Sequence, residues 1–525
     1  MSSMSTTYDL KPHEPPATPA KPRISSLTER LIDALNDSGV AYCHWKSNVS
    51  LDNALAGHED LDLLVDRPAL PRVLEVLASL NFKQAVVRRG DNPAGIAHYY
   101  GHDPELGVLR HVHLFSRVLT GESFVKGHWL PLDAMLLADP TNYEGLRMAR
   151  PEAELVLMLA RNFIKYGSLV DIPYLMRGRS QLRREVAWLR AAADLDETLA
   201  LANHYLPTVP RSLWLACLDA VNEDASLPRR VRLAWRMRRA LLCYRVRGEG
   251  SRLWKYGRLI AERSLRAIVG RKKNKRLLEG GAVIALVGPE ATGKSTLVAE
   301  CAKWLGKTFA VRTVHAGKPP SAWLTWPVNA LLPWLRRYAP TLRTNHIDGH
   351  LESEGLSSPP NARTSEIRAK DMFYAIRSVA LAWDRRRLLL RARRAAAAGE
   401  IVICDRFPSD VIGSMDSPRL EQPFTTGPGW KHRFLAMLAR WEAGLYSQIP
   451  APDGVIQLTV DLETAKSRNR ERIKVGKESD SYVESRHRRA GHWRRAGARN
   501  IRVVDTSGSL DTTIAQMKDV VWTML

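Results

Sequence analysis

The segment that most constrains this chain runs from Gly288 to Thr296 and reads Gly-Pro-Glu-Ala-Thr-Gly-Lys-Ser-Thr. An apolar run, Ala282–Val287, stands directly before it, and a helical pattern, Leu297–Leu305, follows directly. We therefore expect a buried strand, a loop and a helix in succession, which is the context that the spacing G-x-x-x-x-G-K-[ST] needs to form a phosphate-binding loop. The backbone N–H groups of such a loop and the N-terminus of its helix attract the phosphates of a nucleotide.

The side chains of this loop have separate expected roles. Lys294 is expected to reach the β- and γ-phosphates, and the hydroxyl of Ser295 is expected to hold Mg²⁺. The whole loop is expected to bind the nucleotide, through Gly288, Pro289, Glu290, Ala291, Thr292, Gly293, Lys294, Ser295 and Thr296.

Short apolar runs alternate with helical patterns from the Gly280-Gly281 pair to the C-terminus. The expected strands are Ala282–Val287, Val311–His315, Ile401–Cys404, Val455–Val460 and Ile501–Val504. Strands separated by helices predict a parallel sheet with helices on both faces. The fold class is therefore expected to be α/β.

Two further groups of charged residues follow the loop in the sequence. Asp405 comes directly after an expected strand, where the carboxyl ends of parallel strands present ligand-binding groups, and this is the place for a carboxylate that organises Mg²⁺. Arg468 and Arg472 are four residues apart on an expected helix, so they share a face. Phosphoryl transfer needs positioning and positive charge, which arginines on a closing flap can supply. The alternative is that Arg468 and Arg472 simply lie on a solvent-exposed face of the helix.

These motifs together resemble those of thymidylate kinases, which are nucleoside monophosphate kinases of the P-loop class. Glu290 stands where that family has an acid in its loop, Asp405-Arg406-Phe407 matches its Asp-Arg-aromatic motif, and Arg385 has the spacing of its acceptor-binding arginine. The spacing of its lid helix is reproduced by Ala465, Arg468, Arg470 and Arg472. The resemblance implies a P-loop NTPase fold for 279–525. It also implies ATP and Mg²⁺ as cofactors and transfer of the γ-phosphate to a nucleoside monophosphate. Residues implied in catalysis are Lys294, Asp405, Arg406, Arg468, Arg472 and Glu290.

The acceptor side departs from the family pattern. The Thr-Arg-Glu-Pro-Gly-Gly loop is absent, and His315–Pro320 stands in its place, with Lys318 available for an anion. Leu381 replaces the aromatic residue that stacks on the acceptor base. We expect a rebuilt acceptor pocket in which Arg385, Lys318 and Arg406 bind the substrate, so the acceptor is a nucleoside monophosphate or another phosphorylated small molecule.

A second candidate site lies near the N-terminus. Lys46-Ser47 precedes Asp60-Leu61-Asp62, and this order resembles the nucleotidyltransferase signature, with Lys46 in place of the usual glycine. Paired carboxylates in such enzymes hold two metal ions, so Ser47, Asp60 and Asp62 are the candidate residues, with Asp60 and Asp62 as metal ligands. The next expected strand offers no third acid. His113, the candidate replacement there, is also explained as a structural histidine.

The resemblances suggest four regions, which are a disordered tail (1–24), a nucleotidyltransferase-like α/β domain (25–150), a helical basic connector (151–278) and the kinase-like domain (279–525). This pairing resembles large bacterial proteins of surface-polysaccharide biosynthesis. A nucleotidyltransferase in that biosynthesis and a non-catalytic, nucleotide-binding assembly protein therefore stand as alternatives to a kinase.

Charge is concentrated in the connector. The chain has a formal net charge of +23, and 229–276 contains 18 Lys and Arg against two acids, Glu249 and Glu262. A solvated face between domains, an anionic membrane surface and a polyanionic partner such as nucleic acid all fit this stretch. A second copy of the chain, giving a homodimer, is a further expected partner.

Cysteine usage and hydropathy indicate the compartment. Five cysteines without a C-x-x-C pair argue against a disulfide scaffold and for a reducing compartment. No apolar run reaches the ~18 residues of a membrane span, and the N-terminus lacks the apolar core of a signal peptide. We expect a cytoplasmic protein, with the inner membrane surface as the alternative place.

Overall fold

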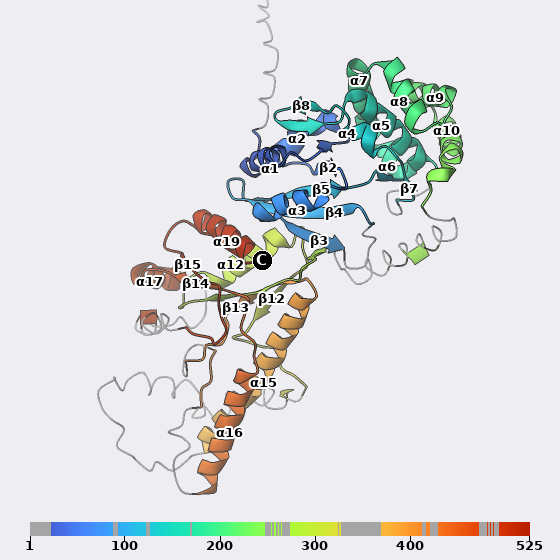
Figure 1. The fold of residues 1–525 in the computed structure, drawn as a ribbon. Coiled ribbons are helices and arrows are strands. Elements are labelled where there is room, and N and C mark those ends of the chain that lie inside the picture. The colour runs from blue at the N-terminus through green and yellow to red at the C-terminus, as the bar shows by residue number, and fades with distance from the viewer. Residues whose placement is uncertain are drawn as a thin grey trace, which may run out of the picture. The chain divides into compact units, whose positions relative to one another are not determined.

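The chain divides into two compact units in its structure (Figure 1), a computed structural model. Unit 1 comprises Met1–Val76 and Arg110–Val246, and unit 2 comprises Leu77–Leu109 and Arg247–Leu525. The structure describes residues 23–87, 93–121, 126–168, 171–246, 274–323, 325–326, 369–411, 416–420, 429–471 and 493–525, with single positions between 254 and 264 and between 480 and 487. Predictions made for 1–22, most of 247–273, 327–365 and Arg472 lie outside the described residues.

The first part of unit 1 is an α/β arrangement. Its strands follow the order β5-β2-β1-β9-β8, in which β2 pairs in parallel with β5 and antiparallel with β1. The elements of unit 1, with those at its margins, are α1 (Ser26–Asp37), β1 (Tyr42–His44), η1 (Asn48–Ser50), α2 (Leu51–Ala56), β2 (Leu61–Val65), α3 (Leu70–Ser79), β5 (Val108–Phe115), β6 (Leu119–Thr120), β7 (His128–Trp129), α4 (Asp133–Leu137), β8 (Thr141–Tyr143) and β9 (Leu146–Met148).

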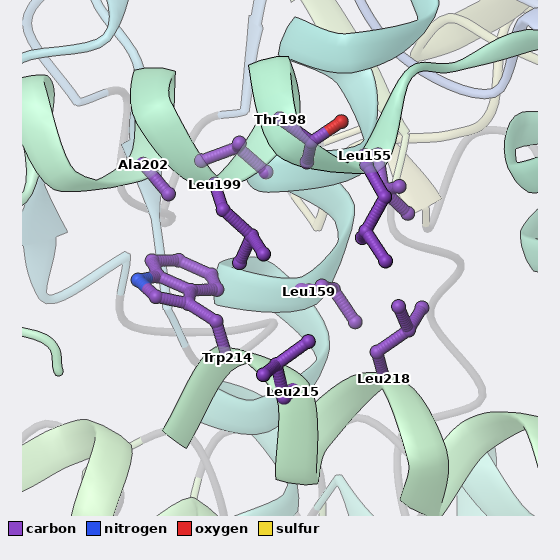
Figure 2. Close-up of a pocket in the computed structure, with 10 residues that line it drawn as sticks. Leu155, Leu159, Thr198, Leu199, Ala202, Trp214, Leu215 and Leu218 are labelled. Atoms are coloured by element: carbon purple, nitrogen blue, oxygen red, sulfur yellow. The ribbon is translucent and has the colours of Figure 1, made fainter. Parts of the chain in front are cut away.

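Helices form the rest of unit 1. They are α5 (Pro151–Tyr166), α6 (Ile172–Arg177), α7 (Arg179–Ala192), α8 (Leu195–Tyr205), α9 (Arg211–Asn222), α10 (Leu227–Ala240) and the short η2 (Leu242–Tyr244). Leu155, Leu159, Leu199 and Trp214 point toward one another between α5, α8 and α9 (Figure 2). They leave a cavity of only about 10 Å³, roughly the room that one water needs. This space is therefore packed core rather than a ligand pocket.

Unit 2 contains a five-stranded parallel sheet of order β12-β13-β11-β14-β15. Its strands are β11 (Val283–Val287), β12 (Val311–His315), β13 (Ile401–Asp405), β14 (Gly454–Thr459) and β15 (Ile501–Asp505). All five lie where the sequence predicted strands, to within one residue at each end. The α/β class and the parallel sheet are thus confirmed.

Helices cover both faces of this sheet, because its central strands alternate apolar side chains between two cores. Ile284 and Leu286 of β11 pack with α12 (Lys294–Leu305) and α19 (Leu510–Met524). Val283, Ala285 and Val287 face the other way, toward α15 (Ala369–Ala397) and α16 (Trp430–Ser447), which run side by side (Figure 1). Burial on both faces explains why the strands read as continuous apolar runs.

A smaller set of antiparallel strands joins the first of these cores. In unit 2, β3 (Lys83–Val87) pairs with both β4 (Ile96–Asp103) and β10 (Lys275–Leu277). A further helix of unit 2, α17 (Leu462–Glu471), follows β14. Trp522 of α19 donates from Nε1 to the carbonyl of Asn81 at 3.1 Å. In the part of the chain that the structure describes, no helix combines the length and apolar character needed to cross a bilayer.

Candidate active site

The predicted phosphate loop connects β11 to α12, at the carboxyl edge of the parallel sheet. Gly288 has a φ of +148°, and a Cβ there would lie 2.5 Å from the carbonyl oxygen of Leu458 in β14. Gly293 has a φ of +78°, directly before the first residue of α12. The two glycines of the motif are therefore required by backbone conformation and, at Gly288, by close approach of the neighbouring strand.

Lys294 lies folded against this loop and is 6% exposed. Its Nζ donates to the carbonyl of Gly288 at 3.1 Å and to the hydroxyl of Thr292 at 3.2 Å, and it also contacts the carbonyl of Pro289. The ammonium group is thus held by the oxygens of the loop itself, and its contact with nucleotide phosphates stays a prediction.

Ser295 and Asp405 meet beside the loop. The hydroxyl of Ser295 donates to Oδ2 of Asp405 at 2.7 Å, because β13 pairs with β11 and brings Asp405 opposite Leu286. Asp405 is 7% exposed, and its Oδ1 has no hydrogen-bond partner among the described residues. Carboxylate and hydroxyl oxygens are ligands that suit Mg²⁺, which also keeps water and phosphate oxygens. The two side chains therefore fit a magnesium site.

Arg406 is central to a chain of ion pairs next to Asp405. Its guanidinium lies 3.0 Å from Glu290 of the phosphate loop and 3.7 Å from Asp416. Burial works against the charged form, but the carboxylates of Glu290, Asp416 and Asp405 outweigh it and raise the pKa of Arg406. Arg406 also has a φ of +71°, a left-handed conformation that is uncommon for a residue other than glycine. The structure thus brings together Glu290 and Arg406, which the sequence predicted separately.

Arg385 is fully enclosed within unit 2. It is 1% exposed and donates to Asp416 at 2.7 Å, to the carbonyl of Ala316 at 2.8 Å and to the hydroxyl of Tyr446. Asp416 thus links the two predicted substrate-binding arginines, Arg385 and Arg406. Sequence reasoning missed Asp416 and Tyr446, because no local motif marks either residue.

The loop after β12 lies on the same side of the sheet. His315 approaches the carbonyl of Asp405 at 3.3 Å through Nδ1. A Cβ on Gly317 would lie 3.1 Å from Cδ of Arg406 and 3.4 Å from Oδ1 of Asp416, so this backbone closely adjoins the arginine cluster. Lys318, the next residue, is exposed. The predicted replacement for the missing acceptor loop therefore adjoins Arg406.

The predicted lid helix is α17. Arg468 donates to the carbonyl of Thr506 at 2.7 Å and thus faces the loop after β15. Arg470 pairs with Asp480. His487, further along the chain, lies 3.3 Å through Nε2 from the carbonyl of Glu290, so this region contacts the phosphate loop. Arg472 is outside the described residues.

The candidate residues of unit 1 form a separate cluster. Asp62 in β2 lies opposite His113 in β5, with their Oδ1 and Nδ1 atoms 3.1 Å apart, and Nζ of Lys46 lies 2.7 Å from the same oxygen. Burial alone would raise the pKa of Asp62, but the charge of Lys46 and the hydrogen bond from His113 hold it well below its usual range. Asp60 pairs with His111 at 2.7 Å.

Positive charge surrounds this carboxylate pair. Burial and the charges of Lys165, Lys46 and Arg161 lower the pKa of Lys126 to about 7. Ser47, the third candidate residue, has a left-handed φ of +60°. Within the described residues, no group of three or more His, Cys, Asp or Glu side chains is arranged to hold a metal ion. A metal pair at Asp60 and Asp62 stays a prediction.

Among known proteins, only solved structures resemble this chain, and they do so at low identity. No family model matches the chain, and no curated protein matches it. Among solved structures, a thymidylate kinase from Candida albicans is similar at 17% identity and a TM-score of 0.26, over 46% of this chain and 92% of that chain. A deoxyadenosine kinase from M. mycoides with bound dATP is similar at 16% identity and a TM-score of 0.27, over 45% of this chain and 97% of that chain. TM-scores this low do not carry an argument about function.

Proposed function

We propose that this chain is an ATP- and Mg²⁺-dependent phosphotransferase that resembles thymidylate kinases and acts on a nucleoside monophosphate or a related phosphorylated small molecule. The observation that carries the proposal is the meeting of Lys294, the Ser295–Asp405 pair and Arg406 at one edge of a parallel sheet. A phosphate loop alone binds nucleotides. The addition of a carboxylate–hydroxyl pair and a second cation supplies what phosphoryl transfer needs.

We assign a separate role to each group of residues in this site. The backbone of 288–294 and the ammonium of Lys294 bind and orient the β- and γ-phosphates of ATP. Ser295 and Asp405 would hold Mg²⁺, which would supply positive charge next to those phosphates. Arg406, fixed by Glu290, presents its guanidinium toward the transferred group. Arg468, which donates to the carbonyl of Thr506 after β15, supplies a further positive charge to hold phosphates.

The acceptor is expected to enter between Arg406 and the loop at Gly317-Lys318. Both arginines pair with Asp416, but the side chain of Arg385 is 1% exposed whereas that of Arg406 is 27% exposed, so only Arg406 is open to a ligand. We therefore assign the acceptor phosphate to Arg406 and Lys318, with Arg385 as a positioning residue that holds Asp416. This arrangement favours an acceptor with a phosphate monoester.

The experiment measures ATP consumption by the full chain against a panel of nucleoside monophosphates and sugar phosphates. Lys294→Ala should lower turnover of whichever acceptor is used by about 10³-fold. Lys303→Ala, in the same helix but 73% exposed and 3.9 Å from Glu300, is the matched control and should retain activity. Equal activity of wild type and Lys294→Ala on every acceptor would contradict the proposal.

Nucleotidyl transfer in unit 1 is the second candidate. Lys126, Arg161 and Lys165 lie near Asp62 and Lys46, and such cations favour a bound triphosphate group. The test is release of pyrophosphate by a Lys294→Ala background, which should disappear in Asp62→Asn. A role in surface-polysaccharide biosynthesis, binding of 229–276 to an anionic surface, a homodimer and a cytoplasmic location stay predictions.

A further inference from the structure

One face of α15 carries arginines that have no counter-charge among the described residues. Trp383, Arg386, Arg387, Leu390, Arg391 and Arg394 line a hollow of about 270 Å³. Their spacing of three and four residues places them on a single face of the helix. No carboxylate among the described residues lies within ion-pair distance of these four arginines. Nε of Arg386 is buried without a hydrogen-bond partner there, although its guanidinium lies 5.7 Å from the ring centre of Trp383.

Other arginines of the same helix are paired. Arg385 donates to Asp416, and Arg393 pairs with Asp453. The contrast within one helix shows that unpaired charge is a property of the hollow rather than of α15 as a whole. Since four guanidinium groups side by side repel one another, a surface of this kind favours an anionic partner.

Two exposed tryptophans belong to a segment that is bonded to α15. The backbone N–H of Ala322 donates to Asp384 at 2.9 Å, and the hydroxyl of Thr325 donates to the same carboxylate at 2.8 Å. Asp384 directly follows Trp383, so these bonds attach Ala322 and Thr325 to α15. Trp323 and Trp326, in that segment, are 83% and 65% exposed. The two exposed indoles therefore belong to a segment anchored at Asp384, the residue next to Trp383 of the arginine face.

We propose that this surface, formed by the arginine face of α15 and the segment with Trp323 and Trp326, docks unit 2 on an anionic lipid membrane. Arginines pair with lipid phosphates, and tryptophans favour the boundary between headgroups and acyl chains. The segment from Pro319 to Trp326 contains no charged residue, so its two tryptophans form an uncharged part separate from the arginines, while Trp383 alone stands among them. Separate parts fit a layered lipid surface better than a nucleic-acid strand, where bases and phosphates alternate.

The experiment is flotation of the full chain with vesicles of phosphatidylcholine that contain 30% phosphatidylglycerol, and with pure phosphatidylcholine vesicles. Binding is expected only to the anionic vesicles and should disappear near ~0.5 M salt, where screening is strong. An Arg387→Ala/Arg391→Ala/Arg394→Ala variant should partition about 100-fold less, since each basic residue near an anionic surface contributes about fivefold. Arg393→Ala, on the same helix, is the matched control and should bind like wild type.

The tryptophans give a second readout. Brominated lipids should quench wild-type fluorescence, and Trp323→Ala/Trp326→Ala should remove most of that quenching. Retained ATP binding by each variant shows that it is folded. Vesicle binding that survives both sets of substitutions would overturn the proposal and would assign the membrane to another surface, such as 229–276. Loss of single-stranded DNA binding by the arginine variant, without any effect of the tryptophans on vesicles, would overturn it in favour of nucleic acid.

Discussion

Asp405 in unit 2 and Asp62 in unit 1 are both aspartates on a buried strand, but their carboxylates have different neighbours. Asp405 accepts one hydrogen bond from Ser295 through Oδ2, and its buried Oδ1 has no partner among the described residues. Oδ1 of Asp62 already lies 2.7 Å from the ammonium of Lys46 and 3.1 Å from His113. The first arrangement leaves an oxygen for a divalent cation, whereas in the second an ammonium stands close to where such a cation would bind.

A carboxylate motif therefore does not by itself define a metal site. Both sites were predicted from an aspartate near a buried strand, yet their neighbours decide what each carboxylate can bind. Lys46 takes the place of a glycine in the signature that unit 1 resembles, and its side chain reaches the carboxylate pair. We therefore expect a divalent cation to bind more tightly beside Asp405 in unit 2 than beside Asp62 in unit 1.

The largest effect is expected from Lys294→Ala in unit 2. Loss of the loop's ammonium should lower kcat/KM by about 10³-fold, because a cation that stabilises the transferring phosphoryl group contributes on that scale. Initial rates with ATP and the best acceptor measure it. Lys46→Ala, which removes the corresponding ammonium of unit 1, should leave the kinase rate unchanged. An equal loss in both variants would show that the two sites do not work separately.

Asp405→Asn should have the next largest effect. The substitution keeps the size of the side chain and removes its charge, so the concentration of Mg²⁺ needed for half-maximal rate should rise and kcat should fall, by about 10²-fold together. Titration with Mg²⁺ at saturating ATP measures both. The control is Asp62→Asn, which should leave the Mg²⁺ titration of the kinase activity unaltered. An unchanged titration in Asp405→Asn would remove Asp405 from the proposed magnesium site.

Lys46→Gly tests the other half of the comparison. Removal of the ammonium should expose Asp60 and Asp62 to a divalent cation, so Mn²⁺ should bind the Lys46→Gly/Lys294→Ala variant at one site more than it binds Lys294→Ala. Paramagnetic relaxation of water protons counts the bound ions. At 100-fold excess over Kd, the added site should stabilise the folded state by about 2.7 kcal/mol. Binding of Mn²⁺ to unit 1 that is equally tight with Lys46 present would contradict the contrast.

The sequence predicted those parts of the site that depend on local pattern. The strand, loop and helix around 288–296 and the place of Asp405 at the end of β13 were predicted, because a buried strand and a glycine spacing are readable within a short window. Asp416 and Tyr446 were not, since they reach Arg385 from 31 and 61 residues away. The ion pair between Lys46 and Asp62 could not be predicted from the sequence either. The lysine was visible as a departure from a signature, but the direction of its side chain depends on tertiary packing.

Asp62→Asn should give the smallest effect, and it concerns stability. The pKa of Asp62 is lowered in the folded state, so the pairing contributes stability that is fully present above the ordinary pKa of an aspartate and is lost as the pH falls through the lower, folded value. The free energy of unfolding in urea should therefore fall between pH 7 and pH 3 for the wild type. It should fall less for Asp62→Asn, which has no carboxylate to protonate at this position. The expected difference is about 1 kcal/mol, because the pair is partly solvated. Asp37→Asn, an exposed aspartate of the same unit, should follow wild type. If Asp62→Asn followed wild type as well, Lys46 and His113 would not be holding this carboxylate in solution, and the coordination position at Asp62 would be as open as the one at Asp405.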